Sequence, residues 1–199
     1  MKKYGIMGGT FNPIHNVHIK IARRAMEQYG LDEVIFMTSG NPPHKRTQNL
    51  PDAHIRHEMV RRAVSGEKGF RADDYEVNLS EYSYSSNTLK HLHELYRGDE
   101  LYFIIGGDSA RDFSTWHKPE EIVKLCTLLV YPREDAEKTE EYKNRILSEY
   151  GGDVRIIDAP VTDISSTVIR ERIQEGKSVR GMIPDSVWEY INENGIYEK

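Results

Sequence analysis

Two histidines stand three residues apart at the end of the stretch GGTFNPIHNVH, which spans residues 8–18. The two glycines at its start follow a short apolar run, and glycine lets the backbone turn sharply and lets a ligand approach the main chain. A helix that begins at Asn16 as its N-cap would bring unpaired N–H groups and the positive end of its dipole between His15 and His18. Backbone donors, a dipole and two imidazoles in one place favour an anion, and phosphate fits them best.

The same stretch also fits simpler interpretations. The chain contains eight histidines, so a close pair arises readily by chance. The glycine pair follows neither the G-x-G-x-x-G fingerprint nor the P-loop pattern. Two histidines at this spacing could bind a metal, although no third ligand or cysteine cluster stands near them in sequence. From the residues alone, a structural turn stays open beside a phosphate site.

Two further segments carry groups that suit phosphate. The stretch DISSTVIRERI (163–173) places three hydroxyls, those of Ser165, Ser166 and Thr167, around a predicted helix start, with Arg170 one turn later. Ser165 could be only an N-cap, but three consecutive hydroxyl residues exceed what capping needs. The loop NPPHK (41–45) adds His44 and Lys45 after a predicted strand. Each segment follows a predicted strand, so the three can converge on one crevice.

The elements that must position these segments alternate along the chain. Apolar runs predict strands at 3–8, 33–39, 101–107, 127–131 and 153–158, and more weakly at 75–80. Helical patterns lie between them at about 17–29, 52–65, 87–97, 118–126 and 137–149. Several runs are apolar throughout, which predicts strands buried on both faces. The alternation predicts an α/β fold with a doubly wound, Rossmann-like parallel sheet, which binds ligands beyond the carboxyl ends of its strands.

Length and composition bound the class of protein. The 199 residues suit a single domain, 1–199, in which 160–199 form a small C-terminal helical subregion. In the last helix, Val187, Trp188 and Ile191 are expected to face the core. The net charge of −5 argues against a nucleic-acid partner. The sequence shows no signal peptide and no membrane-spanning stretch, which predicts a cytoplasmic protein.

The single cysteine, Cys126, lies in an apolar run and is expected to be a buried core thiol. One cysteine also excludes an internal disulfide. Nothing in the pattern fixes the oligomeric state, and a homo-oligomer is compatible with it.

The histidine pair and the late hydroxyl-rich helix start resemble the nucleotidyltransferase superfamily. Within it, the chain resembles the bacterial nicotinate-mononucleotide adenylyltransferases, whose opening motif GGTFDP-x-H-x-G-H corresponds to GGTFNPIHNVH here. The family's P-P-H-K loop corresponds to residues 42–45, and its glycine-rich strand end with Asp and Trp corresponds to GGDSARDFSTW at 106–116. The four motifs follow the family's order over nearly the whole chain.

The resemblance implies transfer of the AMP moiety of ATP to nicotinate mononucleotide, which gives nicotinate adenine dinucleotide and pyrophosphate in NAD biosynthesis. It implies that catalysis rests on His15, His18 and Lys45. It implies that ATP is bound by both histidines and by Gly8, Gly9, Thr10, Phe11, Gly106, Asp108, Ser166, Thr167 and Arg170. Nicotinate mononucleotide would be bound by Lys45, Thr88, Trp116 and Arg133. Mg²⁺ is expected on the triphosphate of ATP, held largely by phosphates and water.

Three of these assignments have an ordinary structural alternative. Trp116 is expected to stack its indole on the pyridine ring, but it could fill the core instead. Thr88 is expected to bind the nicotinate carboxylate, but it also suits a helix start. Asp108 is expected to accept hydrogen bonds from the adenosine ribose, but it also suits a turn at a strand end.

The chain departs from the family pattern at three positions. Asn12 replaces the usual aspartate and keeps an oxygen acceptor. Val17 stands where glycine is usual between the histidines, and a valine that faced the nucleotide would weaken ATP binding. Arg133 lies in YPRED, where the family often has Arg-Pro-Gly, so the arginine is kept but its sequence context differs. A phosphopantetheine adenylyltransferase and a non-catalytic nucleotide-binding module of the same fold stay as alternatives, and the choice between nicotinate and nicotinamide mononucleotide stays open.

Overall fold

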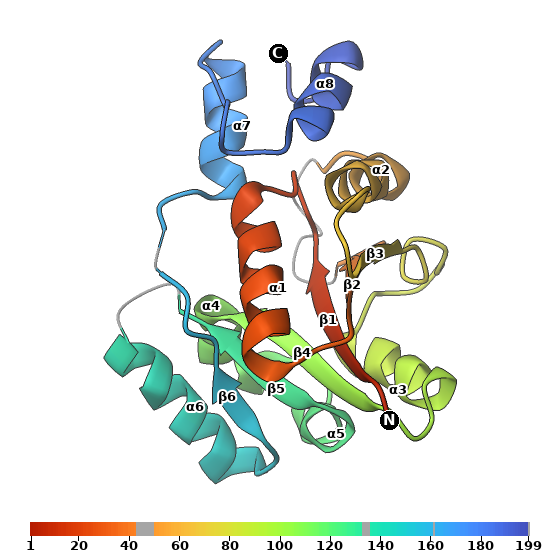
Figure 1. Cartoon of the computed structure of the whole chain (residues 1–199), viewed down its shortest axis with the longest axis vertical. Coiled ribbons are helices and arrows are strands. Elements are labelled where there is room, and N and C mark those ends of the chain that lie inside the picture. The colour runs from red at the N-terminus through yellow and green to blue at the C-terminus, as the bar shows by residue number, and fades with distance from the viewer. Residues whose placement is uncertain (43–49, 133–135, 161, 199) are drawn as a thin grey trace.

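The computed structural model describes residues 1–42, 50–132, 136–160 and 162–198. Two predicted site residues, Lys45 and Arg133, lie outside these ranges, as does the loop residue His44. The described residues form one parallel sheet of six strands in the order β3-β2-β1-β4-β5-β6 (Figure 1). The strands are β1 (Lys3–Gly9), β2 (Glu33–Thr38), β3 (Phe70–Asp73), β4 (Glu100–Gly106), β5 (Thr127–Tyr131) and β6 (Val154–Ile156). The expected doubly wound parallel sheet is therefore confirmed.

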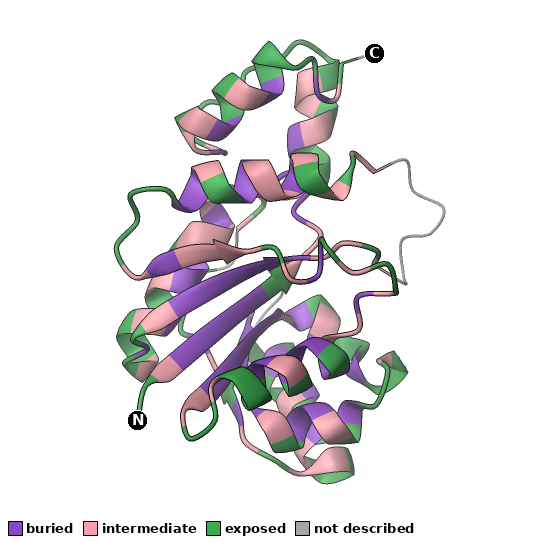
Figure 2. Cartoon of the chain, turned by 90° about the vertical axis from the view of Figure 1, so that its right-hand side faces the viewer, coloured by how far each residue is buried: buried purple, intermediate pink, exposed green. Residues whose placement is uncertain are grey.

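The four central strands are buried on both faces, as their continuous apolar runs predict. In β1, Ile6 packs into the core on one face and its neighbour Met7 into the core on the other. The same alternation holds in β2, where Ile35 and Phe36 belong to opposite cores. Figure 2 shows these strands as mostly buried, with helices on both sides.

Helices cover each face of the sheet and supply those two cores. One core contains residues of α1 (Asn16–Tyr29), α2 (Ala53–Val64), α7 (Ser166–Gln174) and α8 (Asp185–Glu193). The other contains residues of α3 (Ser85–Leu95), α5 (Pro119–Leu125) and α6 (Ala136–Tyr150), with the short α4 (Gly107–Arg111) and the 3₁₀ turn η2 (Phe113–Thr115). The C-terminal helices α7 and α8 lie together at one end of the molecule, next to the start of α1 (Figure 1).

Two expectations about the edge of the sheet and the C-terminus are wrong. Residues 75–80 form turns, and the edge strand β3 lies just before them at Phe70–Asp73. This strand is short, and only Phe70 in it is buried, so it lacks the apolar run that marks the central strands. In α8, Val187 and Ile191 are buried as expected, but Trp188 is 38% exposed.

The structure also tests the expected burial of Cys126 and the expected lack of a membrane-spanning stretch. Cys126 is buried, and burial raises the pKa of its thiol to about 12. Its sulfur donates a hydrogen bond to the carbonyl of Ile122, so it is a core thiol as expected. Over the described ranges, every helix is too short or too polar to cross a membrane.

Candidate active site

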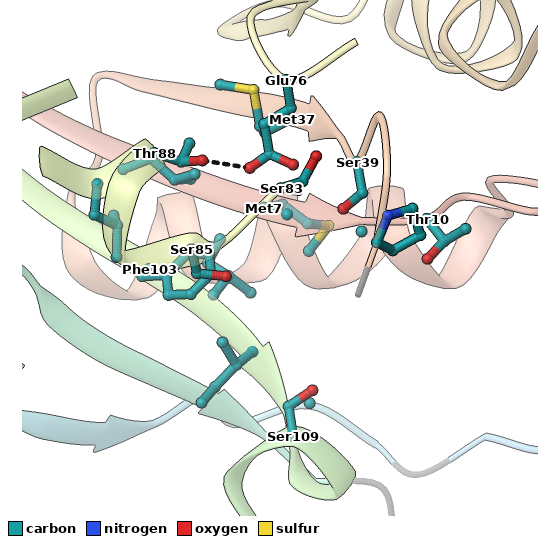
Figure 3. A pocket seen from close by; sticks show the side chains of 18 of the residues that line it. Met7, Thr10, Met37, Ser39, Glu76, Ser83, Ser85, Thr88, Phe103 and Ser109 are labelled. Carbon is teal, nitrogen blue, oxygen red and sulfur yellow. Dashed lines mark hydrogen bonds between the residues drawn. The ribbon is translucent and has the colours of Figure 1, made fainter. Parts of the chain in front are cut away.

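A cavity of about 340 Å³ opens at the carboxyl ends of β1 and β4, where the strand order reverses. This is where a doubly wound sheet binds its ligands. Its lining comes from segments far apart in sequence, including Thr10 after β1, Ser39 after β2 and Ser109 after β4 (Figure 3). The sheet topology therefore brings the segments after β1, β2 and β4 to one place.

His18 lines this cavity, and the local structure fixes its tautomer. The backbone N–H of His15 donates to His18 Nδ1 at 3.2 Å, so a neutral His18 carries its proton on Nε2. The imidazole of His15 is buried and stacks on that of His18 with ring centroids 3.7 Å apart. Phe11 supports His18 from another side through an edge-to-face contact at 5.2 Å. The ring of His18 is thus held in one orientation by its neighbours.

The start of α1 differs from the expectation at one residue. His15 is the N-cap, and Asn16 is already the first residue of the helix. The N–H of Asn16 donates to Met182 O at 2.9 Å, and the N–H of His18 donates to His15 O at 2.9 Å. The expectation that these first-turn amides stay open to a phosphate is wrong at both positions. The Asn16 bond connects α1 to the C-terminal segment, and the His18 bond closes the first turn of the helix on itself.

The histidine loop and the late hydroxyl-rich turn are neighbours in space. Ser166 Oγ donates to Pro13 O at 2.8 Å, and an Arg170 guanidinium nitrogen donates to Asn12 O at 2.8 Å. A second guanidinium nitrogen of Arg170 lies 3.3 Å from Thr167 Oγ1. Ser165 caps α7, as the sequence suggested, by accepting a hydrogen bond from the N–H of Val168 at 3.3 Å.

The predicted site residues fall into three groups. Eight of them line the cavity: Gly8, Gly9, Thr10, His18, Thr88, Gly106, Asp108 and Trp116. Five do not line it. Phe11 and His15 contact His18 of the cavity wall. Ser166, Thr167 and Arg170 are joined to the histidine loop through Pro13 and Asn12, which do not line the cavity. The last two, Lys45 and Arg133, are outside the described residues.

The alternatives for Trp116, Asp108 and Thr88 can be compared with their surroundings. Trp116 is half-buried against Phe113, with ring centroids 5.5 Å apart, while it also lines the cavity. The Asp108 carboxylate is exposed at the cavity and lies 3.8 Å from a guanidinium nitrogen of Arg111. Thr88 is buried in the first turn of α3 and lines the same cavity. Each of these residues therefore combines a structural contact with a position on the cavity wall.

Arg56 is a functional candidate that the sequence reasoning missed. It is 2% exposed, and its guanidinium donates to the carbonyls of Thr10 at 2.7 Å, Ser39 at 2.8 Å, Gly40 at 3.1 Å and Pro51 at 3.0 Å. Desolvation lowers the pKa of Arg56 from its usual value, but a guanidinium stays protonated in proteins. This residue fixes the loops after β1 and β2 relative to each other. The sequence could have indicated this burial, because Arg56 shares the apolar face of α2 with Met59, Val60 and Ala63 at helical spacing.

Glu76 is the second residue that was missed. It lies in the turn segment that was expected to be a strand, is 5% exposed and lines the cavity beside Thr88 (Figure 3). Its neighbour Gly40 is obligatory, because a Cβ on that residue would lie 2.1 Å from Glu76 O. No pattern in the sequence distinguished this carboxylate from an exposed one.

The two departures from the family motif in the described residues are explained by their contacts. Asn12 Oδ1 accepts a hydrogen bond from the hydroxyl of Tyr197 at 2.6 Å, a role that requires only an oxygen acceptor. Val17 is 7% exposed and packs in the core that holds α1, α2, α7 and α8, away from the cavity wall. The valine therefore faces the protein interior and not the nucleotide.

Replacing Val17 by glycine should lower the free energy of unfolding by about 2–4 kcal/mol and leave the Michaelis constant for ATP unchanged. The loss combines a few tenths of a kcal/mol of helix propensity with the larger contribution from burial of a valine side chain. Val168 is the matched control because it is also in the first turn of a helix but 36% exposed. Urea unfolding of both variants measures the difference, and equal losses would show that Val17 contributes no burial.

Metal-ligating side chains do not cluster in the part of the chain that the structure describes. No group of three or more His, Cys, Asp or Glu residues there is arranged to hold a metal ion. The cavity wall offers the imidazoles of His18 and His117, several hydroxyls and glycine-rich backbone, together with the carboxyl groups of Glu76 and Asp108. The imidazole, hydroxyl and backbone N–H groups are donors that suit phosphate oxygens.

Comparison with known proteins gives consistent matches. Residues 6–172 match the family model described as cytidylyltransferase-like. The chain is 41% identical to a probable nicotinate-nucleotide adenylyltransferase of Clostridium kluyveri, over 100% of both chains. It is 42% identical to one of Clostridium botulinum, with 97% of this chain and 98% of the relative covered.

A solved structure supports the fold. The nicotinic acid mononucleotide adenylyltransferase of Plasmodium falciparum, complexed with NaAD, superposes with a TM-score of 0.81 at 20% identity. The match covers 99% of this chain and 98% of that one.

Proposed function

Because the chain belongs to the cytidylyltransferase-like family, among the nicotinate-nucleotide adenylyltransferases, we propose that it transfers AMP from ATP to nicotinate mononucleotide. The products are nicotinate adenine dinucleotide and pyrophosphate, and the reaction belongs to NAD biosynthesis in the cytoplasm. The observation that carries the proposal is one cavity whose wall joins a glycine and histidine loop to an aromatic and hydroxyl corner. The first suits a triphosphate and the second suits a pyridine ring.

The reaction needs positioning and charge neutralisation more than covalent catalysis. The 5′-phosphate of the mononucleotide attacks the α-phosphorus of ATP. The bond from this phosphorus to the oxygen that bridges the α- and β-phosphates breaks, and pyrophosphate leaves. The attacking phosphate is largely ionised at neutral pH, so no general base is required. The protein must hold two anions in line and offset their repulsion.

His18 is the residue we assign to the reacting phosphorus. Its proton is on Nε2 in the neutral form, because Nδ1 accepts the His15 N–H at 3.2 Å. From the cavity wall, this N–H can donate to the non-bridging oxygens on which charge develops. His15 keeps the ring of His18 in place by stacking and supplies the N–H that fixes the tautomer.

The remaining predicted site residues are assigned to the other parts of the two substrates. Gly8, Gly9 and Thr10 offer backbone to the triphosphate, and Asp108 faces the ribose. Ser166, Thr167 and Arg170 take the β- and γ-phosphates at the edge of the histidine loop, where Arg170 already binds Asn12 O. Lys45 is assigned to the phosphates where the substrates meet, and Arg133 to the mononucleotide. The nucleotide substrate is the magnesium complex of ATP, whose metal neutralises phosphate charge.

One assay tests this function. The purified protein is incubated with ATP, Mg²⁺ and nicotinate mononucleotide, and pyrophosphate and dinucleotide are measured. Nicotinamide mononucleotide and phosphopantetheine are supplied in parallel. Turnover of phosphopantetheine alone would select the other adenylyltransferase, and ATP binding without any product would select a non-catalytic module.

Replacing Trp116 by alanine should raise the Michaelis constant for nicotinate mononucleotide about tenfold, because stacking on an aromatic side chain contributes about 1–3 kcal/mol. The Michaelis constant for ATP should change little. Trp188, which is 38% exposed on α8, provides the matched control because its alanine variant loses an indole outside the cavity. Steady-state kinetics with each substrate varied in turn measures both constants, and an unchanged mononucleotide constant would remove Trp116 from the pocket.

A further inference from the structure

The corner of the cavity assigned to the pyridine ring contains a buried acid. The Glu76 side chain is 5% exposed and points towards Thr88 and Ser83 (Figure 3). The Thr88 hydroxyl donates to Glu76 Oε1 at 2.6 Å. A carboxyl group in this position contacts the hydroxyl that we expect to meet the ring substituent of the substrate. The protonation state of Glu76 therefore affects whether the Thr88 hydroxyl can donate a hydrogen bond to the substrate.

Hydroxyl groups surround this carboxyl group. Ser83 Oγ accepts hydrogen bonds from the N–H groups of Gly40 at 3.1 Å and Asn41 at 3.2 Å, so its own proton is left to donate. The hydroxyls of Ser83 and Ser39 both hydrogen-bond to the Glu76 side chain, together with that of Thr88. The packing of Gly40 against Glu76 O fixes the backbone of this arrangement.

The protonation state of Glu76 decides whether the Thr88 hydroxyl donates a hydrogen bond to the substrate or accepts one from it. A threonine hydroxyl has one proton to donate and two lone pairs to accept with. While the proton goes to an ionised Glu76, the oxygen can only accept, which suits an amide N–H and repels a carboxylate. When Glu76 is protonated, it can donate to Thr88 Oγ1, and the threonine proton can then be donated to a substrate carboxylate, in competition with the carbonyl of Tyr84 at 3.3 Å.

We propose that Glu76 determines the pyridine preference of this cavity by setting the direction in which the Thr88 hydroxyl donates. Protonated Glu76 favours the acid, nicotinate mononucleotide, and ionised Glu76 favours the amide, nicotinamide mononucleotide. Glu76 is a positioning residue, because it acts on the substrate through Thr88. The inference rests on the proposed function and names the feature of this chain that selects its second substrate.

The surroundings of Glu76 shift its titration in a known direction. Burial raises the pKa of its carboxyl group above the ordinary value, and the negative charge of Asp73 at the end of β3 raises it further, against the hydroxyl hydrogen bonds. Tyr75 adjoins it in the same turn, and His18, His117 and Asp108 line the same cavity. The protonated form therefore persists to higher pH than in an exposed glutamate. Preference for the acid is expected to fall as pH rises through the folded-state pKa.

The experiment compares the two mononucleotides as a ratio of kcat/KM across about pH 5.5 to about pH 9, a span in which both carry the same 5′-phosphate with its second ionisation at about pH 6. Titration of the phosphate and of groups that contact it therefore cancels in the ratio. Wild type should show an acid-to-amide ratio that falls with pH. The Glu76→Gln variant has an amide nitrogen that donates to Thr88 at every pH, so its ratio should stay flat. At the alkaline end it should exceed the wild-type ratio by about tenfold.

Two further variants test whether the pH dependence comes from Glu76. Asp73→Asn removes a charge that raises the pKa of Glu76, so the midpoint of the ratio should move to lower pH with the same limits. Glu94→Gln makes the same chemical change as Glu76→Gln at an exposed position on α3 and should reproduce the wild-type profile. Identical profiles for wild type and Glu76→Gln, with both mononucleotides turned over, would overturn the inference alone. Turnover of neither mononucleotide by wild type would overturn the proposed function instead.

Discussion

Replacing His18 by alanine is expected to lower kcat about a thousandfold, since removing one preorganised donor to a transition-state oxygen costs about 10²–10³ or more. The Michaelis constants for ATP and the mononucleotide should change far less, because the lost hydrogen bond strengthens only as charge develops on the α-phosphate. The structure gives this donor a fixed direction, because His15 N–H holds Nδ1 and leaves the proton on Nε2. Single-turnover and steady-state kinetics together measure the change.

Two conservative variants separate this role from helix capping. His18→Asn keeps an acceptor near the position of Nδ1 for the N–H of His15, but has no donor where Nε2 lies. His18→Gln can place an amide donor near the position of Nε2. If His18 acts as the donor, the glutamine variant retains more turnover than the asparagine variant. Near-normal turnover of the alanine variant would reject the assignment.

The central strands could be predicted because strands buried on both faces appear in the sequence as continuous apolar runs. Strands β1, β2, β4 and β5 are apolar on both faces, and their expected bounds agree with the structure to within one residue at each end. The edge strands lack this signal. β3 has a single buried residue, Phe70, and β6 is only three residues long, so neighbours and not local pattern decide where they pair.

The site could be predicted only where its chemistry stands next to a strand end. The sequence indicated the proximity of the histidine loop to the late hydroxyl-rich turn, and the bonds from Ser166 to Pro13 and from Arg170 to Asn12 confirm it. It did not indicate the burial of Glu76, because a glutamate in a turn is ordinarily solvated. The contacts that bury it come from Ser39, Gly40 and Thr88, which tertiary structure alone brings together.

Replacing Arg56 by methionine is expected to lower the free energy of unfolding by about 3–5 kcal/mol and to reduce kcat with it. Methionine fills similar space but leaves four carbonyl oxygens in a buried site without their charged donor, and each such loss costs about 1–3 kcal/mol before relaxation. The carbonyls belong to the loops after β1 and β2 that line the cavity, so their displacement moves Thr10 and Ser39. Arg56→Lys should recover only part of the stability, because one ammonium cannot reproduce the planar fork of a guanidinium.

Arg61 on the same helix provides the control for the Arg56 effect. Its side chain is 62% exposed, and it pairs with Glu58 at 2.6 Å on the surface, so Arg61→Met should leave the free energy of unfolding close to that of the wild type. Urea unfolding of the two variants measures the difference directly. Activity of the folded fraction then tests positioning, because a residue with only a structural role would lower stability and leave kcat per folded molecule unchanged. Equal stability of the Arg56 and Arg61 variants would show that the four carbonyls find other donors and that Arg56 does not hold the two loops together.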